Sequence, residues 1–100
     1  MELSINEKRE LKKKLEEKAE LFKAISHPIR LCILEMLLRN NKSNVTQMHC
    51  CFEVSQSTVS QHLTKLKAAG IITGHREGVE IYYSISNEEV KKIIKLILQN

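Results

Sequence analysis

The sequence predicts a mostly α-helical domain that carries one small β-hairpin. Its 100 residues, of which 42% are hydrophobic, suffice for one domain with one modest core, so we expect residues 1–100 to form a single domain that needs a partner subunit to cover its remaining apolar surface. Only two Tyr, two Phe and no Trp occur, a composition that favours packed helices over aromatic-rich strands. Apolar residues follow helical spacing along most of the chain and alternate with polar ones only in a short later stretch.

Two helices are expected before the middle of the chain. Residues 6–25 form a charged helix whose apolar stripe suits packing on another helix, including one from a second subunit. The members of that stripe are Leu11, Leu15, Phe22 and Ile25. Pro28 ends this helix and fits the first turn of the next, which is expected over residues 28–39. The second helix carries apolar residues at core spacing, namely Ile29, Cys32, Ile33, Met36 and Leu37.

Two short helices joined by a tight turn are expected over residues 44–69, which is a helix-turn-helix. The first runs from about Thr46 to Phe52, with Asn44 or Thr46 as its cap. Its inward residues are Val45, Met48 and Phe52. The second is capped by Ser55 and closed by Gly70, and its buried stripe consists of Val59, Leu63 and Leu66. Glu53 stands where the turn of this motif usually holds Gly, so we expect a turn that is slightly opened or strained.

The C-terminal third predicts a hairpin and a last helix. Strands over 71–75 and 79–85 flank Arg76, Glu77 and Gly78, so residues 71–85 form a wing. The strand residues expected on one face are Val79, Ile81, Tyr83 and Ile85. A helix over 87–99 is too apolar for the end of a small monomer, and we expect it to meet its counterpart across a twofold axis together with helix 6–25. Its stripe consists of Val90, Ile93, Ile94, Ile97 and Leu98.

The solvent face of the second short helix carries small hydrogen-bonding side chains. Ser57, Ser60, Gln61 and Thr64 lie opposite its buried stripe. Short donors and acceptors can approach base edges without the obstruction of a long side chain, so this face is typical of DNA reading. The alternative is an ordinary solvated helix face.

Charge supports a DNA partner. The net charge is +4, and no Asp or Glu occurs between Glu53 and Glu77, which lets this part of the surface approach phosphates. Lys65, His75 and Arg76 are the candidates for contacts to the DNA backbone. A solvated surface with an accidental excess of lysine is the alternative.

The sequence lacks the signatures of several other classes of function. The charged N-terminus does not read as a signal peptide, and no run approaches the roughly 20 apolar residues of a membrane span, so we expect a cytoplasmic protein without a membrane partner. No paired carboxylates, Gly-rich phosphate loop or Cys-His pair with an orienting group is present, so we expect neither catalysis nor a cofactor. A winged helix that binds protein is an alternative, although the polar face lacks hydrophobic and charged anchors.

Three strings together resemble the ArsR family of winged-helix repressors. They are AISHPIRLCIL at 24–34, QSTVSQHLTKLKAAGII at 56–72 and EGVEIYYSIS at 77–86. The resemblance implies a homodimer that places one recognition helix from each subunit in successive major grooves of a partly palindromic operator and blocks transcription there. It also implies that the positions facing the groove are Gln56, Ser57, Ser60 and Gln61. Thr58 is expected to contact a phosphate or to make a hydrogen bond in the first turn.

The metal sites of the family are not expected in this chain. The resemblance puts the family's Cys-x-Cys pair at Asn44 and Thr46, and neither residue is a thiolate. The family's second site uses Asp and His in the last helices, but residues 86–100 contain neither.

The cysteines offer a different regulatory signal. Cys32, Cys50 and Cys51 are an odd number without a framework spacing, which favours reduced thiols, with Cys32 as an inert core residue. His49 and the two adjacent cysteines fan out at about 100° steps on a helix and cannot converge on one tetrahedral ion. Oxidation of Cys50 or Cys51 beside the DNA-reading turn is the main alternative signal. Of the other histidines, His62 is expected to pack half-buried and His27 to cap or pack.

Overall fold

The computed structural model describes residues 2–48 and 52–99. Within these residues the chain forms four α-helices, one short 3₁₀ helix and one antiparallel hairpin, which confirms the predicted fold class. In chain order the elements are α1 (Ile5–Ile25), α2 (Pro28–Asn40), η1 (Val45–Gln47), α3 (Gln56–Ala68), β1 (Ile72–Glu77), β2 (Glu80–Ile85) and α4 (Glu88–Leu98).

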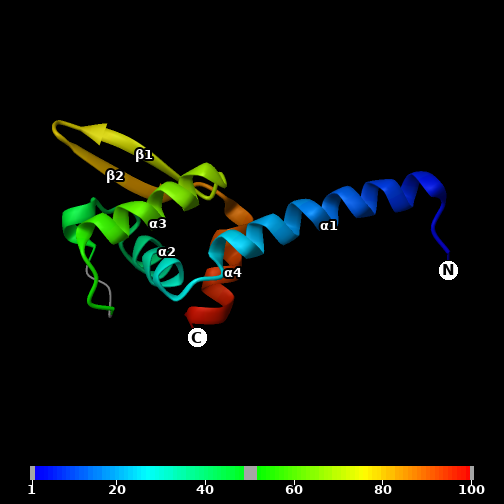
Figure 1. Ribbon diagram of the computed structural model, residues 1–100, viewed down its shortest axis with the longest axis horizontal. Coiled ribbons are helices and arrows are strands. Elements are labelled where there is room, and N and C mark those ends of the chain that lie inside the picture. Colours follow the sequence, from blue (N-terminus) through cyan, green and yellow to red (C-terminus); the bar gives the residue numbers. More distant parts are fainter. Residues whose placement is uncertain (1, 49–51, 100) are drawn as a thin grey trace.

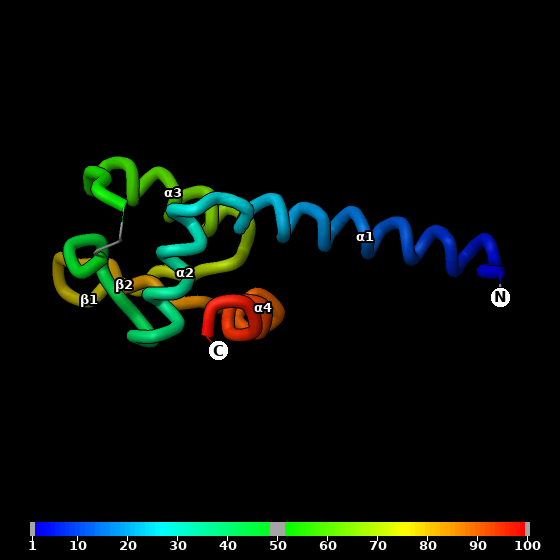
Figure 2. Tube along the Cα trace, turned by 90° about the horizontal axis from the view of Figure 1, so that it is seen from below, coloured from blue at the N-terminus to red at the C-terminus, as the bar shows by residue number. Residues whose placement is uncertain are grey.

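The molecule consists of a compact body and a protruding helix. Figure 1 shows α2, α3, α4 and the hairpin gathered together, while α1 leaves this body as a rod, and the longest axis measures 53 Å. Figure 2 shows from below that the N-terminal part of α1 touches no other segment. α1 begins with a capping box between Ser4 and Glu7, and Ile25 is its one buried residue. Most of its predicted apolar stripe is therefore exposed, including Leu15 at 59% and Phe22 at 54%.

The core lies between α2, α3, the base of the hairpin and α4. Pro28 opens α2 as predicted, and Nδ1 of His27 caps it by accepting a hydrogen bond of 3.1 Å from the backbone N–H of Ile29. The residues with no measurable exposure come from all four parts, namely Ile33, Leu34, Leu66, Ile71, Val90 and Ile94. None of the helices formed by the described residues combines the length and apolar character needed to traverse a lipid bilayer.

The first helix of the predicted helix-turn-helix differs from expectation. Among the described residues of this stretch, the 3₁₀ helix η1 is the only helix, and its reciprocal hydrogen bonds between Asn44 and Gln47 identify Asn44 as the cap. Met48 is buried as predicted. Phe52 is 42% exposed, so the prediction that it points inward was wrong. Short runs with a capped first turn commonly form such i to i+3 turns.

The strain expected at Glu53 is absent. Among the described residues Asn41 alone adopts a positive φ without being Gly, at the C-terminal end of α2. The described residues between η1 and α3 are not helical, and Glu53 is one of them. Its φ is not positive, so the turn position usually held by Gly is not left-handed in this chain.

The start and end of α3 match the sequence closely. Ser55 accepts a hydrogen bond of 3.1 Å from the N–H of Thr58 and thereby caps the helix. Gly70 lies just past the end with φ +72°, a conformation that residues with a Cβ rarely adopt.

The hairpin turns later than predicted. Gly78, with φ +65°, and Val79 form the turn, while Arg76 and Glu77 belong to β1 rather than to the tip. The predicted apolar face is buried only at its base, since Ile85 is 8% exposed and Val79 is 92% exposed. Because the wing projects from the body, the core covers only the residues at its base.

The last helix is amphipathic and only half covered. Asn87 caps α4 by accepting a hydrogen bond of 3.0 Å from Val90 N–H. Val90 and Ile94 are fully buried, whereas Ile97 is 50% exposed and Leu98 is 43% exposed. The described chain therefore leaves an apolar strip of α4 in solvent.

Candidate nucleic-acid interface

The helix α3 turns its polar face to solvent. Gln56, Ser57, Ser60 and Gln61 are all exposed. Within the described residues no hydrogen bond is made by any of these four side chains. Their donors and acceptors are therefore available to an outside partner, which is what contacts to base edges in a major groove require.

The opposite side of α3 anchors it to the body. Val59, Leu63 and Leu66 are 4%, 2% and 0% exposed, so the predicted stripe is confirmed. Burial of three aliphatic side chains fixes the rotation of the helix about its axis. The polar face therefore has a defined direction before any ligand binds.

Two threonines of α3 are engaged with the helix itself. The hydroxyl of Thr58 lies 3.1 Å from Oγ of Ser55, so the hydrogen bond expected in the first turn is present. The hydroxyl of Thr64 donates to the backbone carbonyl of Ser60 at 3.0 Å. These hydroxyls are less available to DNA than those of the serines on the same helix.

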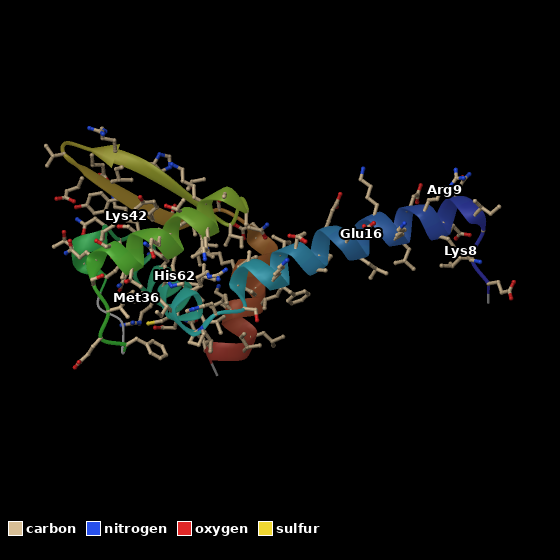
Figure 3. All side chains as sticks on the ribbon, viewed as in Figure 1. Lys8, Arg9, Glu16, Met36, Lys42 and His62 are labelled. Carbon is tan, nitrogen blue, oxygen red and sulfur yellow. The ribbon has the colours of Figure 1, made fainter. Side chains whose placement is uncertain are left out.

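A histidine pair connects α3 to the start of α2. His62 is 9% exposed, more buried than expected, and the centroid of its ring lies 4.4 Å from that of His27. Figure 3 labels His62 where α3 passes α2. Its Nδ1 has no hydrogen-bond partner among the described residues. Burial, helped by the nearby charges of His27, Arg30 and Lys65, lowers the pKa of His62 from its usual 6.5.

The hairpin carries two of the residues predicted to contact the DNA backbone, and it places them on opposite faces. His75 lies opposite Tyr82 and Arg76 lies opposite Ile81 in the antiparallel register. Neighbouring residues of a strand point to opposite faces, so His75 and Arg76 cannot reach the same phosphate. Both side chains are exposed, as is Lys65 on α3.

One basic residue beside the hairpin was not predicted as part of the site. Lys42 lies in the loop between α2 and η1, and its Nζ is 2.9 Å from a carboxylate oxygen of Glu77. The two residues are 35 positions apart, and no local pattern in the sequence indicates their contact.

The structure corrects the prediction that Cys32 is a reduced thiol. Cys32 is disulfide-bonded and only half-buried, so it is not the inert reduced thiol that the sequence favoured. Its position at core spacing gave no information about which sulfur atoms are close in space. The predictions for His49, Cys50 and Cys51 lie outside the described residues.

The described residues hold no group of three or more His, Cys, Asp and Glu side chains that could bind a metal ion. At the position of the family's thiolate pair, Asn44 is committed to the capping box of η1 and Thr46 is exposed. The amide and the hydroxyl are also weak ligands for a soft metal.

The recognition helix and the hairpin together define a winged helix-turn-helix DNA-binding protein. Residues 27–73 match the family described as bacterial regulatory protein, arsR family. The transcriptional repressor PagR of Bacillus anthracis is 47% identical over 83 residues, which are 83% of each chain. The crystal structure of PagR matches this structure with a TM-score of 0.75. The match covers 83% of this chain and 94% of the PagR chain.

A second relative extends the similarity. The transcriptional activator HlyU of Vibrio cholerae is 36% identical over 88 residues, 88% of this chain and 81% of its own length. The structure of reduced HlyU matches this structure with a TM-score of 0.80. The match covers 88% of this chain and 92% of the HlyU chain. The chain therefore belongs to the ArsR family, and it is a DNA-binding transcriptional regulator.

Proposed function

We propose that the protein is a homodimeric repressor that occupies a partly palindromic operator and thereby blocks transcription. Each copy of α3 enters a major groove, and each hairpin lies along the neighbouring backbone. We place the protein in the cytoplasm because the operator lies there. The proposal includes no catalytic activity. The observation that carries the proposal is the exposed face of α3, whose serine and glutamine side chains make no hydrogen bond with the other described residues.

The residues of the interface have two different roles. Gln56, Ser57, Ser60 and Gln61 contact base edges, and Gln61 can offer a bidentate amide to adenine, a pair that discriminates by about 1 to 3 kcal/mol. The contacts to phosphates position the protein without specifying sequence, and they come from Lys65, His75 and Arg76.

Dimerisation uses the apolar surface that α1 and α4 leave exposed. One depression of about 200 Å³ is lined by Leu21, Phe22, Ile25, Val90 and Ile93, with Lys18 and Glu89 at its rim. A second, of about 360 Å³, lies between Phe22, Ile25, Leu31 and Ile97. Phe22 lines both, so a second copy of this chain that covers Phe22 closes a continuous apolar surface.

The proposal is tested by selecting binding sites for the purified protein from a library of random DNA duplexes. We expect one enriched sequence with two related half-sites about 10 base pairs apart from centre to centre. The logarithm of its affinity should fall linearly and steeply with the logarithm of salt concentration. Failure to enrich any sequence, or a single unpaired half-site, would contradict the proposal.

The disulfide at Cys32 favours a redox-responsive form of the same function. Forming such a bond takes two electrons and two protons from two thiols and gives them to an oxidant such as a peroxide. The affinity for the selected duplex is measured after peroxide treatment and after full reduction. A change of about threefold or more supports a redox signal, and equal affinities would contradict it.

A further inference from the structure

The loop between α2 and η1 forms a third edge beside the hairpin. The N–H of Ser43 donates to the carbonyl of Tyr83 at 3.0 Å, and the N–H of Tyr83 donates to the carbonyl of Ser43 at 2.9 Å. Ser43 itself is 1% exposed. The backbone before η1 is therefore joined to β2, and the preceding residue, Lys42, points to the opposite, outer face.

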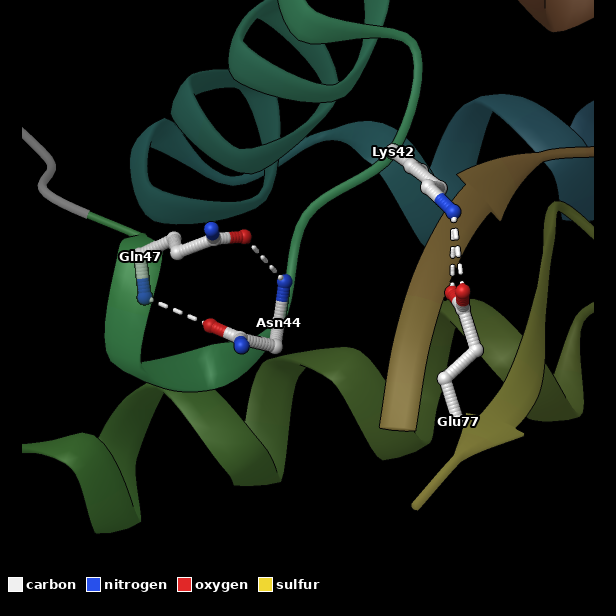
Figure 4. Close-up of polar contacts among 4 residues, drawn as sticks. All are labelled: Lys42, Asn44, Gln47 and Glu77. Carbon is white, nitrogen blue, oxygen red and sulfur yellow. Dashed lines mark hydrogen bonds and ion pairs between the residues drawn. The ribbon is translucent and has the colours of Figure 1, made fainter. Parts of the chain in front are cut away.

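The side chain of Lys42 crosses that outer face. Its Nζ lies 5.0 Å from the centroid of the Tyr82 ring. The same Nζ lies 2.9 and 3.2 Å from the two carboxylate oxygens of Glu77, the ion pair drawn in Figure 4. His75 pairs with Tyr82, and Glu77 lies two residues further along β1, so all three lie on the same face. One ammonium group thus connects the loop, β2 and the last residue of β1.

This contact has two consequences for a hairpin that approaches DNA. A two-stranded hairpin has little stability of its own, so its direction depends on what fastens it to the body. Glu77 lies on the same face as His75, and an unpaired carboxylate there would repel the phosphates that His75 is meant to reach. The Lys42 ammonium both neutralises Glu77 and holds the outer part of the hairpin.

We propose that Lys42 is a positioning residue for DNA recognition: through its ion pair with Glu77 it fixes the hairpin against the helix-turn-helix, so that operator binding depends on the pair. This inference rests on the proposed function. The side chains of Lys42 and Glu77 are 57% and 49% exposed, so the pair adds little to global stability, and its loss should appear in DNA selectivity.

The test compares Glu77→Lys with Glu80→Lys. Glu80 is the cross-strand partner of Glu77, and within the described residues it makes no ion pair, so both substitutions add the same charge to the same hairpin and only one breaks the contact. Affinities are measured for the selected duplex and for a shuffled duplex of equal length, at a temperature at which circular dichroism shows every variant folded.

Glu80→Lys should tighten binding to both duplexes by the same factor. Glu77→Lys should tighten binding to the shuffled duplex but lower the ratio of selected to shuffled affinity about two- to fivefold, the range expected for an exposed ion pair. Adding Lys42→Glu to Glu77→Lys should restore the ratio, because the pair then exists with its charges exchanged.

Equal ratios for Glu77→Lys and Glu80→Lys, or a double variant that does no better than Glu77→Lys alone, would overturn the inference. These outcomes differ from a failure of the proposed function. In that case the unchanged protein itself would not prefer the selected duplex to the shuffled one.

Discussion

The side chains of α3 divide into those the helix uses and those it leaves free. Thr58 and Thr64 bond within the helix, while Gln61 and Ser57 make no side-chain hydrogen bond within the described chain. A free amide beside a base edge can specify sequence, whereas a contact between an arginine and a phosphate adds affinity without specifying sequence. This division predicts different effects for the two kinds of residue.

Gln61→Ala and Arg76→Ala should separate specificity from affinity. Gln61→Ala is expected to cost about 1 to 3 kcal/mol on the selected duplex and to relax the preference at one position of each half-site. Arg76→Ala is expected to weaken binding to all sequences alike and to lower the salt slope by about 1 per subunit. Titrations against duplexes with single-base changes, at several salt concentrations, measure both effects. Equal losses for both variants on every duplex would refute the division.

The acid sensitivity of the fold should depend on His62. Its folded-state pKa lies below the usual 6.5, so the unfolded chain binds more protons. The stability from this group is complete above pH 6.5 and is lost as the pH falls from 6.5 through the folded pKa. His62→Phe keeps a ring beside His27, removes the Nδ1 that has no partner among the described residues, and should flatten the fall in unfolding free energy as the pH drops below 6.5.

Urea unfolding at a series of pH values measures this dependence. His75→Asn is the control, because it removes an exposed histidine and should leave the pH dependence of the unchanged protein intact. An equally steep acid loss in His62→Phe would show that another group causes it.

At the scale of the element, α3 depends on its cap more than on its exposed serines. Ser55 accepts the N–H of Thr58, so Ser55→Ala should lower the unfolding free energy by about 1 kcal/mol. Ser57→Ala removes an exposed hydroxyl without a partner and should leave stability unchanged while weakening operator binding. Thermal unfolding and DNA titration of both variants check the contrast, and an unstable Ser57→Ala or a fully stable Ser55→Ala would speak against it.

The elements that the sequence predicted well are those with local signals. The long periodic helices, the cap at Ser55 and the closing Gly70 all depend on residues within a turn or two of each other. The errors occurred where tertiary contacts decide. In the described part of the predicted helix 46–52, the capped 3₁₀ turn η1 is present, and Phe52 is exposed despite its apolar side chain.

The candidate site was predictable to the same extent. The polar face of α3 follows from helical periodicity, so its exposed residues could be named from the sequence. The opposite directions of His75 and Arg76 depend on strand register, which the sequence placed too early, with Arg76 in the turn. The Lys42–Glu77 ion pair joins residues 35 positions apart and has no local signature, and the core spacing of Cys32 gave no sign of its disulfide.

At the scale of the whole molecule, the exposed apolar surface of α1 and α4 predicts a dimer. Figure 3 shows charged residues such as Lys8, Arg9 and Glu16 along the protruding part of α1, where no other element covers them. Phe22→Glu places a charge in both depressions and should yield a monomer by light scattering, with operator affinity reduced about a hundredfold or more because two half-sites are no longer linked.

Val79→Glu is the control for the oligomeric state. Val79 is also an exposed apolar residue, at 92%, but it lies at the tip of the hairpin. This variant should remain a dimer. A dimeric Phe22→Glu protein would place the interface elsewhere.

The most direct test is a missing-base interference footprint, in which each base of the selected duplex is removed in turn and the loss of binding is measured. We predict two clusters of sensitive bases on one face of the DNA, about 10 base pairs apart, with Gln61→Ala removing the sensitivity at the same position in each cluster. A single cluster, or a footprint that Gln61→Ala leaves unchanged, would contradict the claim that two copies of α3 read the operator.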